Sequence, residues 1–272
     1  MICRYPVPIS KFVNGKKYSY WVPCGHCAWC LRQKRNEWFI RMLEESKHHL
    51  FTRFVTLDYR DDDLPLKVDE NSGEVIPVVS LSDIQNFHKK VRKKYEFRFF
   101  LASEYGPKHG RPHYHAIYWS DEKIDWSNLW THGDVTADLP AKPESFKYVT
   151  KYILKGGFTP VGADPLFHTM SRRPGIGSEF CGKYNEHFPY YRYFGSKMKM
   201  PRYYDRKFIE SLNPDLKAEI STEKLEYLSG IDKWNSLEND FQKNGKNYDS
   251  LEDYVNDLYK IDLFKQFKIN KK

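Results

Sequence analysis

The sequence predicts an α+β fold in which an antiparallel sheet is flanked by helices. Short runs of alternating apolar and polar residues indicate strands, and longer segments with apolar residues at helical spacing indicate helices. A chain of 272 residues can bury one large domain, or one domain with an appendage. We expect that domain in residues 1–205, with a Cys-rich segment at its N-terminus, and a helical extension in residues 206–272.

The first half of the domain is predicted to alternate helices and strands. Apolar positions at helical spacing predict a helix over residues 28–49, and a strand is expected over residues 52–59. An acidic loop and an Asn-Ser-Gly turn precede a short strand over residues 75–79. A second helix is expected over residues 82–95, with Ser82 as the first residue of a capping box.

The second half is predicted to hold a hairpin and a third helix. Strands are expected over residues 97–105 and 113–119, because apolar and aromatic residues there flank a turn that contains Gly and Pro. A helix is expected over residues 143–154, ended by two glycines. The stretch over residues 156–174 is rich in Gly and Pro, which is typical of a long functional loop.

His113 and His115 form a candidate metal-binding pair. Side chains alternate along a strand, so both imidazoles project from the same face, roughly 7 Å apart along the backbone, and can reach one ion. Glu104, on the preceding strand, is a candidate third ligand. A His-x-His pair on a strand also arises by chance, and the two rings are then simply hydrogen-bonded within the protein.

Tyr148 and Tyr152 are candidate oxygen nucleophiles. Their spacing places both hydroxyls on one face of the predicted helix, and each is followed three residues later by a lysine, Lys151 and Lys155. Either lysine could assist attack by a phenol or stabilise a leaving oxygen. In a chain with 20 tyrosines, such a pair is more often an aromatic stripe that packs a helix on a sheet.

Cysteine spacing indicates a second candidate metal site. The pattern Cys-x-x-Cys-x-x-Cys is that of a metal knuckle, and a distant N-terminal cysteine completes a four-thiolate set for structural zinc. The candidate ligands are Cys3, Cys24, Cys27 and Cys30, with His26 as a substitute donor. The alternative is that the last two are small buried apolar residues at the start of a helix. Cys181 has no partner in the sequence pattern.

The charge distribution favours a nucleic-acid partner. Residues 1–205 carry 32 lysines and arginines against 23 acidic residues, whereas residues 206–272 carry 12 against 13. Basic, aromatic-rich chains suit single-stranded nucleic acid, although many soluble proteins are basic for other reasons. We recognise no secretory signal and no transmembrane run, so no membrane partner is expected. Without a Gly-x-x-x-x-Gly-Lys-Ser/Thr loop, unwinding must come from another protein.

The joint pattern resembles a known family. A His-hydrophobic-His pair followed by Tyr-x-x-Lys resembles the HUH endonucleases, and the duplicated Tyr-x-x-Lys-Tyr form resembles their two-tyrosine replication initiators. The chain resembles most closely the replication initiators of microviruses, single-stranded DNA bacteriophages, and among them the gokushovirus group. The matching stretches are Pro23 to Cys27, Phe54 to Leu57, Gly106 to His115, the tyrosine helix, Ser171 to Gly177 and Pro201 to Tyr204.

This resemblance implies an HUH/RRM-like palm and a rolling-circle endonuclease. It implies Mg²⁺ or Mn²⁺ as the cofactor at the His pair, and tyrosine attack that gives a 5′-phosphotyrosine and a free 3′ hydroxyl. The second tyrosine would cut again after one round of synthesis, and we favour Tyr152 for the first attack because it lies nearer the mobile loop. The implied partners are single-stranded origin DNA, a host helicase and the host replication machinery, in the cytoplasm of an infected bacterium.

Two other interpretations remain open. In the first, the protein is a zinc-knuckle protein that binds single-stranded nucleic acid without catalysis, and the tyrosines stack on bases. In the second, it is a metal-dependent phosphoesterase that activates water. The first predicts binding without covalent capture, and the second predicts cleavage without a protein-linked product.

Overall fold

The computed structural model describes most of the chain up to residue 218. The described residues are 3, 5, 7–13, 15–70, 72–106, 109–154, 158–183, 190–215, 217–218 and 222. Residues 35–180 form one compact unit, and the described residues up to Lys34 together with those from Cys181 onward belong to a second. The division predicted between residues 205 and 206 stays a prediction.

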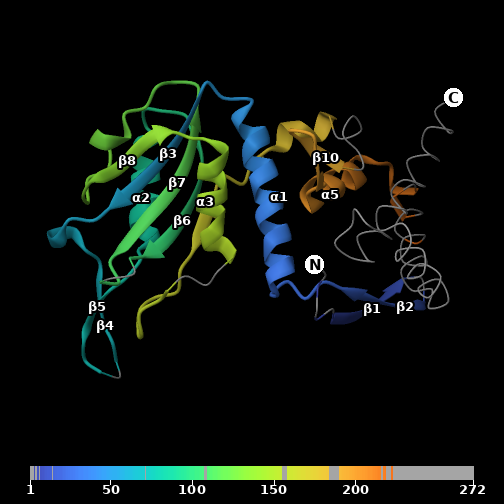
Figure 1. The fold of residues 1–272 in the computed structure, drawn as a ribbon, viewed down its shortest axis with the longest axis horizontal. Coiled ribbons are helices and arrows are strands. Elements are labelled where there is room, and N and C mark those ends of the chain that lie inside the picture. Colours follow the sequence, from blue (N-terminus) through green and yellow to red (C-terminus); the bar gives the residue numbers. More distant parts are fainter. Residues whose placement is uncertain are drawn as a thin grey trace. The chain divides into compact units, whose positions relative to one another are not determined.

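A five-stranded antiparallel sheet forms the centre of the larger unit. The strand order is β8-β3-β7-β6-β9, so β7 is the central strand and pairs with β3 on one side and β6 on the other. The strands are β3 (Phe51–Asp58), β6 (Arg98–Tyr105), β7 (Pro112–Ser120), β8 (Val135–Pro140) and β9 (His168–Met170). Helices flank this sheet (Figure 1), and the predicted α+β class with an antiparallel sheet is confirmed.

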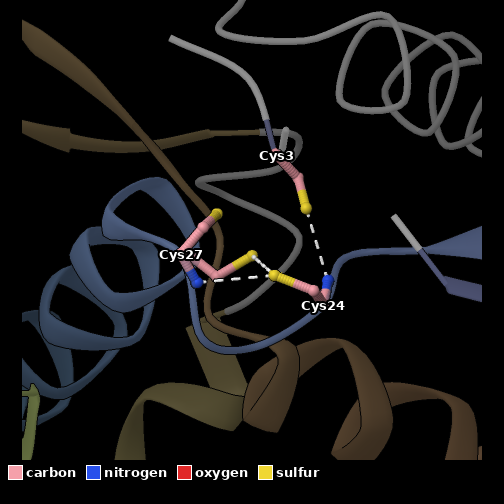
Figure 2. Close-up of side chains that lie close together, drawn as sticks. Cys3, Cys24 and Cys27 are labelled. Atoms are coloured by element: carbon pink, nitrogen blue, oxygen red, sulfur yellow. Dashed lines mark hydrogen bonds between the residues drawn. The ribbon is translucent and has the colours of Figure 1, made fainter. Parts of the chain in front are cut away.

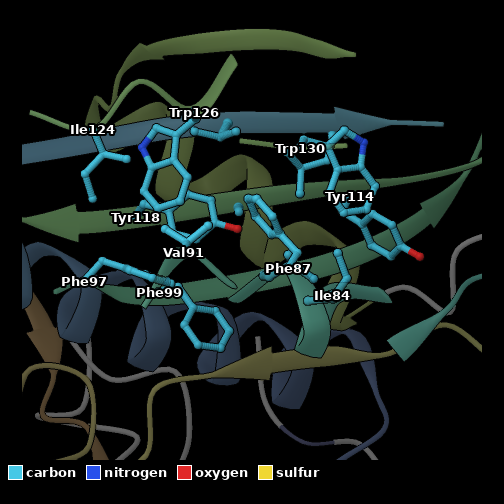
Figure 3. Packing of buried hydrophobic residues seen from close by; sticks show 14 of the residues in the cluster. Ile84, Phe87, Val91, Phe97, Phe99, Tyr114, Tyr118, Ile124, Trp126 and Trp130 are labelled. Atoms are coloured by element: carbon cyan, nitrogen blue, oxygen red, sulfur yellow. The ribbon is translucent and has the colours of Figure 1, made fainter. Parts of the chain in front are cut away.

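One face of the sheet carries the main hydrophobic core. Helix α2 (Leu81–Val91) contributes Ile84, Phe87 and Val91 to it. From the sheet come Tyr114, Ala116 and Tyr118, which alternate with the two histidines along β7 and therefore point to the opposite face from them. Figure 3 shows these helix and strand residues packed together with the rings of Trp126 and Trp130. The imidazoles of His113 and His115 accordingly lie on the side of the sheet away from α2.

Two helices contact the other face. The ring of Trp38, in α1 (Ala28–Ser46), lies 4.9 Å from that of Phe100 in β6. Helix α3 (Pro143–Leu154) lies along β6 and β7 (Figure 1). It buries Phe146 and Val149, and its exposed positions include Lys151. The face that carries the histidine pair is therefore covered in part by the helix that carries the tyrosines.

Shorter elements complete the two units. In the larger unit these are the hairpin of β4 (Leu66–Val68) and β5 (Val75–Pro77), and the one-turn helices η1 (Asp61–Asp63) and η2 (Trp126–Asn128). The described part of the smaller unit contains the antiparallel pair β1 (Val7–Val13) and β2 (Lys16–Val22), the pair β10 (Tyr190–Tyr193) and β11 (Ser196–Lys199), and α5 (Arg202–Ser211). The short helix η3 (Ser178–Lys183) begins in the first unit and ends in the second.

The structure differs from the sequence prediction at three places. Helix α2 is capped by Ser80, whose hydroxyl accepts a hydrogen bond from the Asp83 amide, and not by Ser82. The predicted loop over residues 156–174 contains β9, which adds an edge strand to the sheet. The strands β1, β2 and β8 were not predicted. Most of the predicted extension over residues 206–272 lies outside the described residues.

Candidate functional site

Strand register brings the predicted metal ligands together. Because directly paired residues project from the same face of a sheet, side chains form rows across β3, β7 and β6. The two neighbouring rows are Asp58, His113 and Glu104, and then Thr56, His115 and Ala102. Glu104 is thus placed directly opposite His113, and the small side chain of Ala102 lies opposite His115. This arrangement leaves the Glu104 carboxylate beside both imidazoles.

The two histidines address the same carboxylate oxygen. The Nε2 atoms of His113 and His115 lie 3.1 Å and 3.0 Å from Oε2 of Glu104. One ligand atom from each residue lies within 4.8 Å of the other two, close enough for all three to bind one ion. The donor set of two imidazoles and one carboxylate leaves coordination positions open for substrate oxygens. The predicted ligand group is therefore compatible with a catalytic metal.

Each imidazole is oriented through its other nitrogen. Nδ1 of His115 lies 3.0 Å from the hydroxyl of Thr56, and Nδ1 of His113 lies 3.3 Å from the carbonyl oxygen of Arg111. When Nδ1 carries the proton and donates to these oxygens, Nε2 presents a lone pair to a metal. Burial, together with the neighbouring His113, lowers the pKa of His115, although Glu104 opposes this shift. His115 is consequently neutral at physiological pH, as a ligand must be.

Sequence reasoning did not find the roles of Thr56 and Arg111. Both act through contacts between strands or across a turn, and no local spacing indicates them. A Thr-x-Asp pattern at the end of β3, read together with the register, is the one available signal. Asp58 itself faces the same side as His113, and its carboxylate accepts a hydrogen bond of 2.5 Å from the Thr136 hydroxyl.

Tyr148 lies against the histidine pair. Its ring centroid is 5.0 Å from that of His115, with the two planes nearly perpendicular, and 5.8 Å from that of Phe54. The side chain remains 41% exposed, so the ring packs on the site and still faces solvent. This tyrosine therefore combines both of its predicted roles, because it contacts the sheet as an aromatic side chain and remains open to a substrate.

The other predicted residues of α3 are described only in part. Lys151 is exposed on the last turn of the helix. For Tyr152 the structure describes the backbone, within α3, but not the side chain, and Lys155 lies outside the described residues. The preference for Tyr152 as the first nucleophile stays a prediction.

The predicted cysteines also come together. Cys3, Cys24, Cys27 and Cys30 each place a sulfur atom within 4.8 Å of the other three. His26 lies in the same loop, where its backbone amide donates to the sulfur of Cys24. Cys181 is a free thiol outside this group. The four cysteines are thus a second group that can hold a metal ion, formed within the smaller unit.

Comparison with known proteins relates this geometry to a family. The model of a family of replication-associated proteins, described by the name ORF2, matches residues 52–157. That stretch begins in β3 and ends just after α3, so it contains the Glu104, His113 and His115 group and the tyrosine helix. The chain resembles phage replication-associated proteins. The predicted resemblance to phage replication initiators is thereby confirmed.

Three relatives are replication-associated proteins of phages. Protein VP4 of Bdellovibrio phage phiMH2K is 24% identical over 220 residues, which cover 72% of this chain and 70% of the relative. ORF4 of Chlamydia phage 1 is 23% identical over 76% of this chain and 58% of the relative. ORF2 of Spiroplasma virus 4 is 30% identical over 44% of this chain and 36% of the relative. No solved structure matches the chain.

Helix lengths bear on the expectation of no membrane partner. Within the described residues, no helix is both long enough and apolar enough to cross a bilayer.

Proposed function

We propose that the protein initiates rolling-circle replication of a single-stranded DNA phage genome by nicking and rejoining the origin strand. The names of its relatives support a role in replication. The observation that carries the nicking activity is the convergence of His113 and His115 on Glu104, with the ring of Tyr148 packed on His115. A nucleophile and a metal-binding group on one face of a sheet are the two parts that tyrosine transesterification requires.

Glu104, His113 and His115 would hold Mg²⁺ or Mn²⁺. A divalent ion bound there supplies Lewis-acid polarisation of the scissile phosphate. Thr56 and the Arg111 carbonyl keep the two imidazole rings oriented, so that both Nε2 atoms stay aimed at the ligand position. Burial of His115 excludes water from one side of the group, which strengthens the electrostatic interactions made there.

The reaction exchanges one phosphodiester for another. The tyrosine oxygen attacks phosphorus, a bond from that oxygen to phosphorus forms, and the bond from phosphorus to the 3′ oxygen breaks. The phenol loses its proton and the departing 3′ oxygen gains one. The products are a 5′-phosphotyrosine and a free 3′ hydroxyl, and attack by a 3′ hydroxyl on the phosphotyrosine reverses the step. Rejoining therefore needs no nucleotide cofactor.

Tyr148 and Tyr152 would alternate as nucleophiles. A phenol with the ordinary pKa of about 10 is mostly protonated at neutral pH, so attack requires a nearby cation or base. Lys151 and Lys155 are placed in the sequence to supply that cation to Tyr148 and Tyr152 respectively. After one round of synthesis the second tyrosine cuts the regenerated origin, and the first phosphotyrosine is released as a closed circle.

Partners and location follow from this activity. The positive surplus of residues 1–205 supports binding of single-stranded origin DNA through its phosphates. Synthesis and unwinding would come from the host polymerase machinery and a host helicase, in the cytoplasm of the infected bacterium.

The metal group is tested with labelled single-stranded origin DNA and Mn²⁺. Wild-type protein should cleave the strand and retain label after denaturation. His113→Ala and His115→Ala should each abolish cleavage but keep most DNA binding, because binding rests on distributed basic and aromatic contacts. Glu104→Gln should resemble them. His109→Ala, at an exposed histidine of the β6–β7 turn, is the matched control and should cleave normally.

Each class of function gives a different result in this assay. Cleavage without retained label identifies a hydrolase that activates water, and binding without cleavage identifies a nucleic-acid-binding protein. Both results reject the proposed transesterification. Normal cleavage by both histidine variants in chelator-treated buffer rejects the metal group alone.

The tyrosines are assigned by mapping the DNA-linked peptide with mass spectrometry. Tyr148→Phe and Tyr152→Phe should each keep partial first cleavage but fail to release a closed circle, and the double variant should form no adduct. Tyr95→Phe, in the loop after α2, is the matched control. An adduct on neither tyrosine would reject the mechanism. An adduct on one, with the other dispensable for circle release, would reject alternation.

A further inference from the structure

Four thiols from two short segments surround one point in the smaller unit. The sulfur atoms of Cys24 and Cys30 lie 3.9 Å apart, and all four sulfurs lie within 4.8 Å of one another. Figure 2 shows how Cys3 approaches the loop of Cys24 and Cys27 from a separate part of the chain. Four thiolates at about 2.3 Å from a tetrahedral ion are about 3.8 Å from one another. The separation of Cys24 and Cys30 is that of two ligands on one ion.

The loop around Cys24 has the hydrogen bonds of a metal knuckle. The backbone N–H groups of His26 and Cys27 point at the Cys24 sulfur, at 3.5 Å and 3.4 Å, and the N–H of Cys24 points at the sulfur of Cys3, at 3.3 Å. Gly25, at φ +81°, makes this turn possible because it adopts a conformation that other residues rarely reach. Amide donors aimed at sulfur stabilise the charged thiolate over the neutral thiol.

The protonation behaviour of these thiols agrees with that arrangement. The amide groups of His26 and Cys27 lower the pKa of the Cys24 thiol, which is therefore prepared to lose its proton. Burial raises the pKa of the Cys30 thiol, so this residue becomes a thiolate only when a cation compensates the charge. One prepared ligand and one that needs the ion are expected at a site completed by metal.

We infer that Cys3, Cys24, Cys27 and Cys30 bind one zinc ion, which fastens both ends of the β1–β2 hairpin to the first turn of α1. Cys3 precedes β1 and Cys24 follows β2, so these two ligands bracket the hairpin. Cys27 accepts the first backbone hydrogen bond of α1, from Leu31, and Cys30 lies within that first turn. The ion is structural, because four protein ligands leave no position for a substrate.

The hairpin has too little core of its own to be held without such a bond. Among the residues of β1 and β2, Tyr18 alone is buried. The buried apolar cluster at its base consists of Cys3, Trp29 and Cys30. An isolated two-stranded hairpin is marginally stable in water, and small elements without a core usually depend on a metal or a disulfide.

Two alternative roles for the cysteines fit less well. Cysteines that act as small apolar residues do not require amide donors directed at sulfur, and two of the four thiols are only half-buried. An iron–sulfur cluster would separate the thiolates by the width of several atoms, whereas these sulfurs are close enough to share a single ion. Cysteine thiolates in a tetrahedral set are typical of zinc.

Metal analysis of the full chain, purified without chelator, tests the inference. Wild-type protein should contain about one equivalent of zinc that dialysis does not remove. Cobalt exchanged into the site should give the thiolate-to-metal charge-transfer absorption that nitrogen and oxygen ligands cannot produce, which separates it from metal bound by Glu104, His113 and His115. Cys24→Ser should lose the equivalent of zinc and the charge-transfer band. Cys181→Ser, the matched control, should keep both.

A proteolysis measurement covers the structural role, and holds even where a cysteine variant folds poorly. Trypsin should cleave wild-type protein after Lys11, Lys16 or Lys17 at least tenfold faster once zinc is removed, and added zinc should restore protection. Wild-type protein without zinc and without the cobalt band, or with iron in its place, overturns the zinc site. Zinc retained by Cys24→Ser overturns the ligand set, and unchanged proteolysis overturns the role in holding the hairpin.

Discussion

At the scale of single residues, the Thr56 hydroxyl is the contact that orients His115. It lies 3.0 Å from Nδ1, and both groups are buried, so no water can replace it readily. We expect Thr56→Val, which keeps the shape but removes the hydroxyl, to lower cleavage about 10- to 100-fold at limiting Mn²⁺. Excess Mn²⁺ should recover part of the loss, because Thr56 acts by positioning a ligand. The measurement is the nicking rate as a function of Mn²⁺ concentration.

The control for this prediction lies on the same strand and the same face. Thr52→Val, four residues before Thr56 in β3, removes a hydroxyl that is not paired with either histidine and should leave the metal dependence unchanged. Equal Mn²⁺ dependence in Thr56→Val and wild type would show that the hydroxyl does not orient the ligand. Thr56→Ser should restore most of the activity.

The sequence indicated the ligands but not the residues that orient them. His113 and His115 could be predicted because the alternation of side chains along one strand is a local property. The contact of Thr56 with His115 depends on the register between β3 and β7, and a shift of one residue would reverse it. No spacing within a single strand encodes that register. The approach of Tyr148 to His115 likewise depends on how α3 lies on the sheet.

At the scale of elements, the start of α2 gives a measurable test of its cap. The Ser80 hydroxyl accepts a hydrogen bond of 3.2 Å from the Asp83 amide. Ser80→Ala should lower the free energy of unfolding by about 1 kcal/mol, because a helix amide loses its partner. Ser82→Ala, at the residue that the capping-box pattern indicates, should cost only a few tenths of a kcal/mol. Urea denaturation of both variants measures the difference, and a larger loss in Ser82→Ala would reverse the assignment.

Long elements could be predicted, and short ones at the edges could not. The helices α1 and α3 and the strands β3, β6 and β7 have strong periodicity, because each presents one face or both faces to a core. Strand β9 has three residues and lies within a Gly- and Pro-rich stretch, so its pairing with β6 is what makes it a strand. The β1–β2 hairpin is exposed on almost all positions, and burial therefore leaves no alternating pattern in its sequence.

At the scale of the whole molecule, the core behind the sheet makes folding stability depend on pH. His88, in α2, is buried among the rings of Phe97, Phe99 and Tyr118, and its Nε2 lies 2.9 Å from the Tyr118 hydroxyl. Burial, reinforced by the charge of Arg92, lowers the pKa of His88 to about 3. The folded protein therefore holds this imidazole neutral at pH values where an unfolded histidine, with a pKa of about 6.5, becomes charged.

The sign of the effect follows from proton binding. Between about pH 3 and pH 6.5 the unfolded chain binds a proton at His88 that the folded chain does not, so acid favours unfolding. The contribution is fully present above about pH 6.5 and is lost by up to about 1.4 kcal/mol for each pH unit below it. Other groups titrate in the same range, with His115 acting in the same direction and His49 in the opposite one. The contribution of His88 must therefore be taken as a difference between two proteins.

His88→Gln provides that difference. The amide keeps a polar partner for the Tyr118 hydroxyl and has no proton to gain, so the variant should be less stable at neutral pH but should lose less stability in acid. Urea denaturation at several values between about pH 5 and pH 6.5 should give a slope of unfolding free energy against pH that is lower than the wild-type slope by up to about 1.4 kcal/mol per unit. Parallel slopes would mean that His88 is protonated in the fold, and that the core behind the active face of the sheet admits charge.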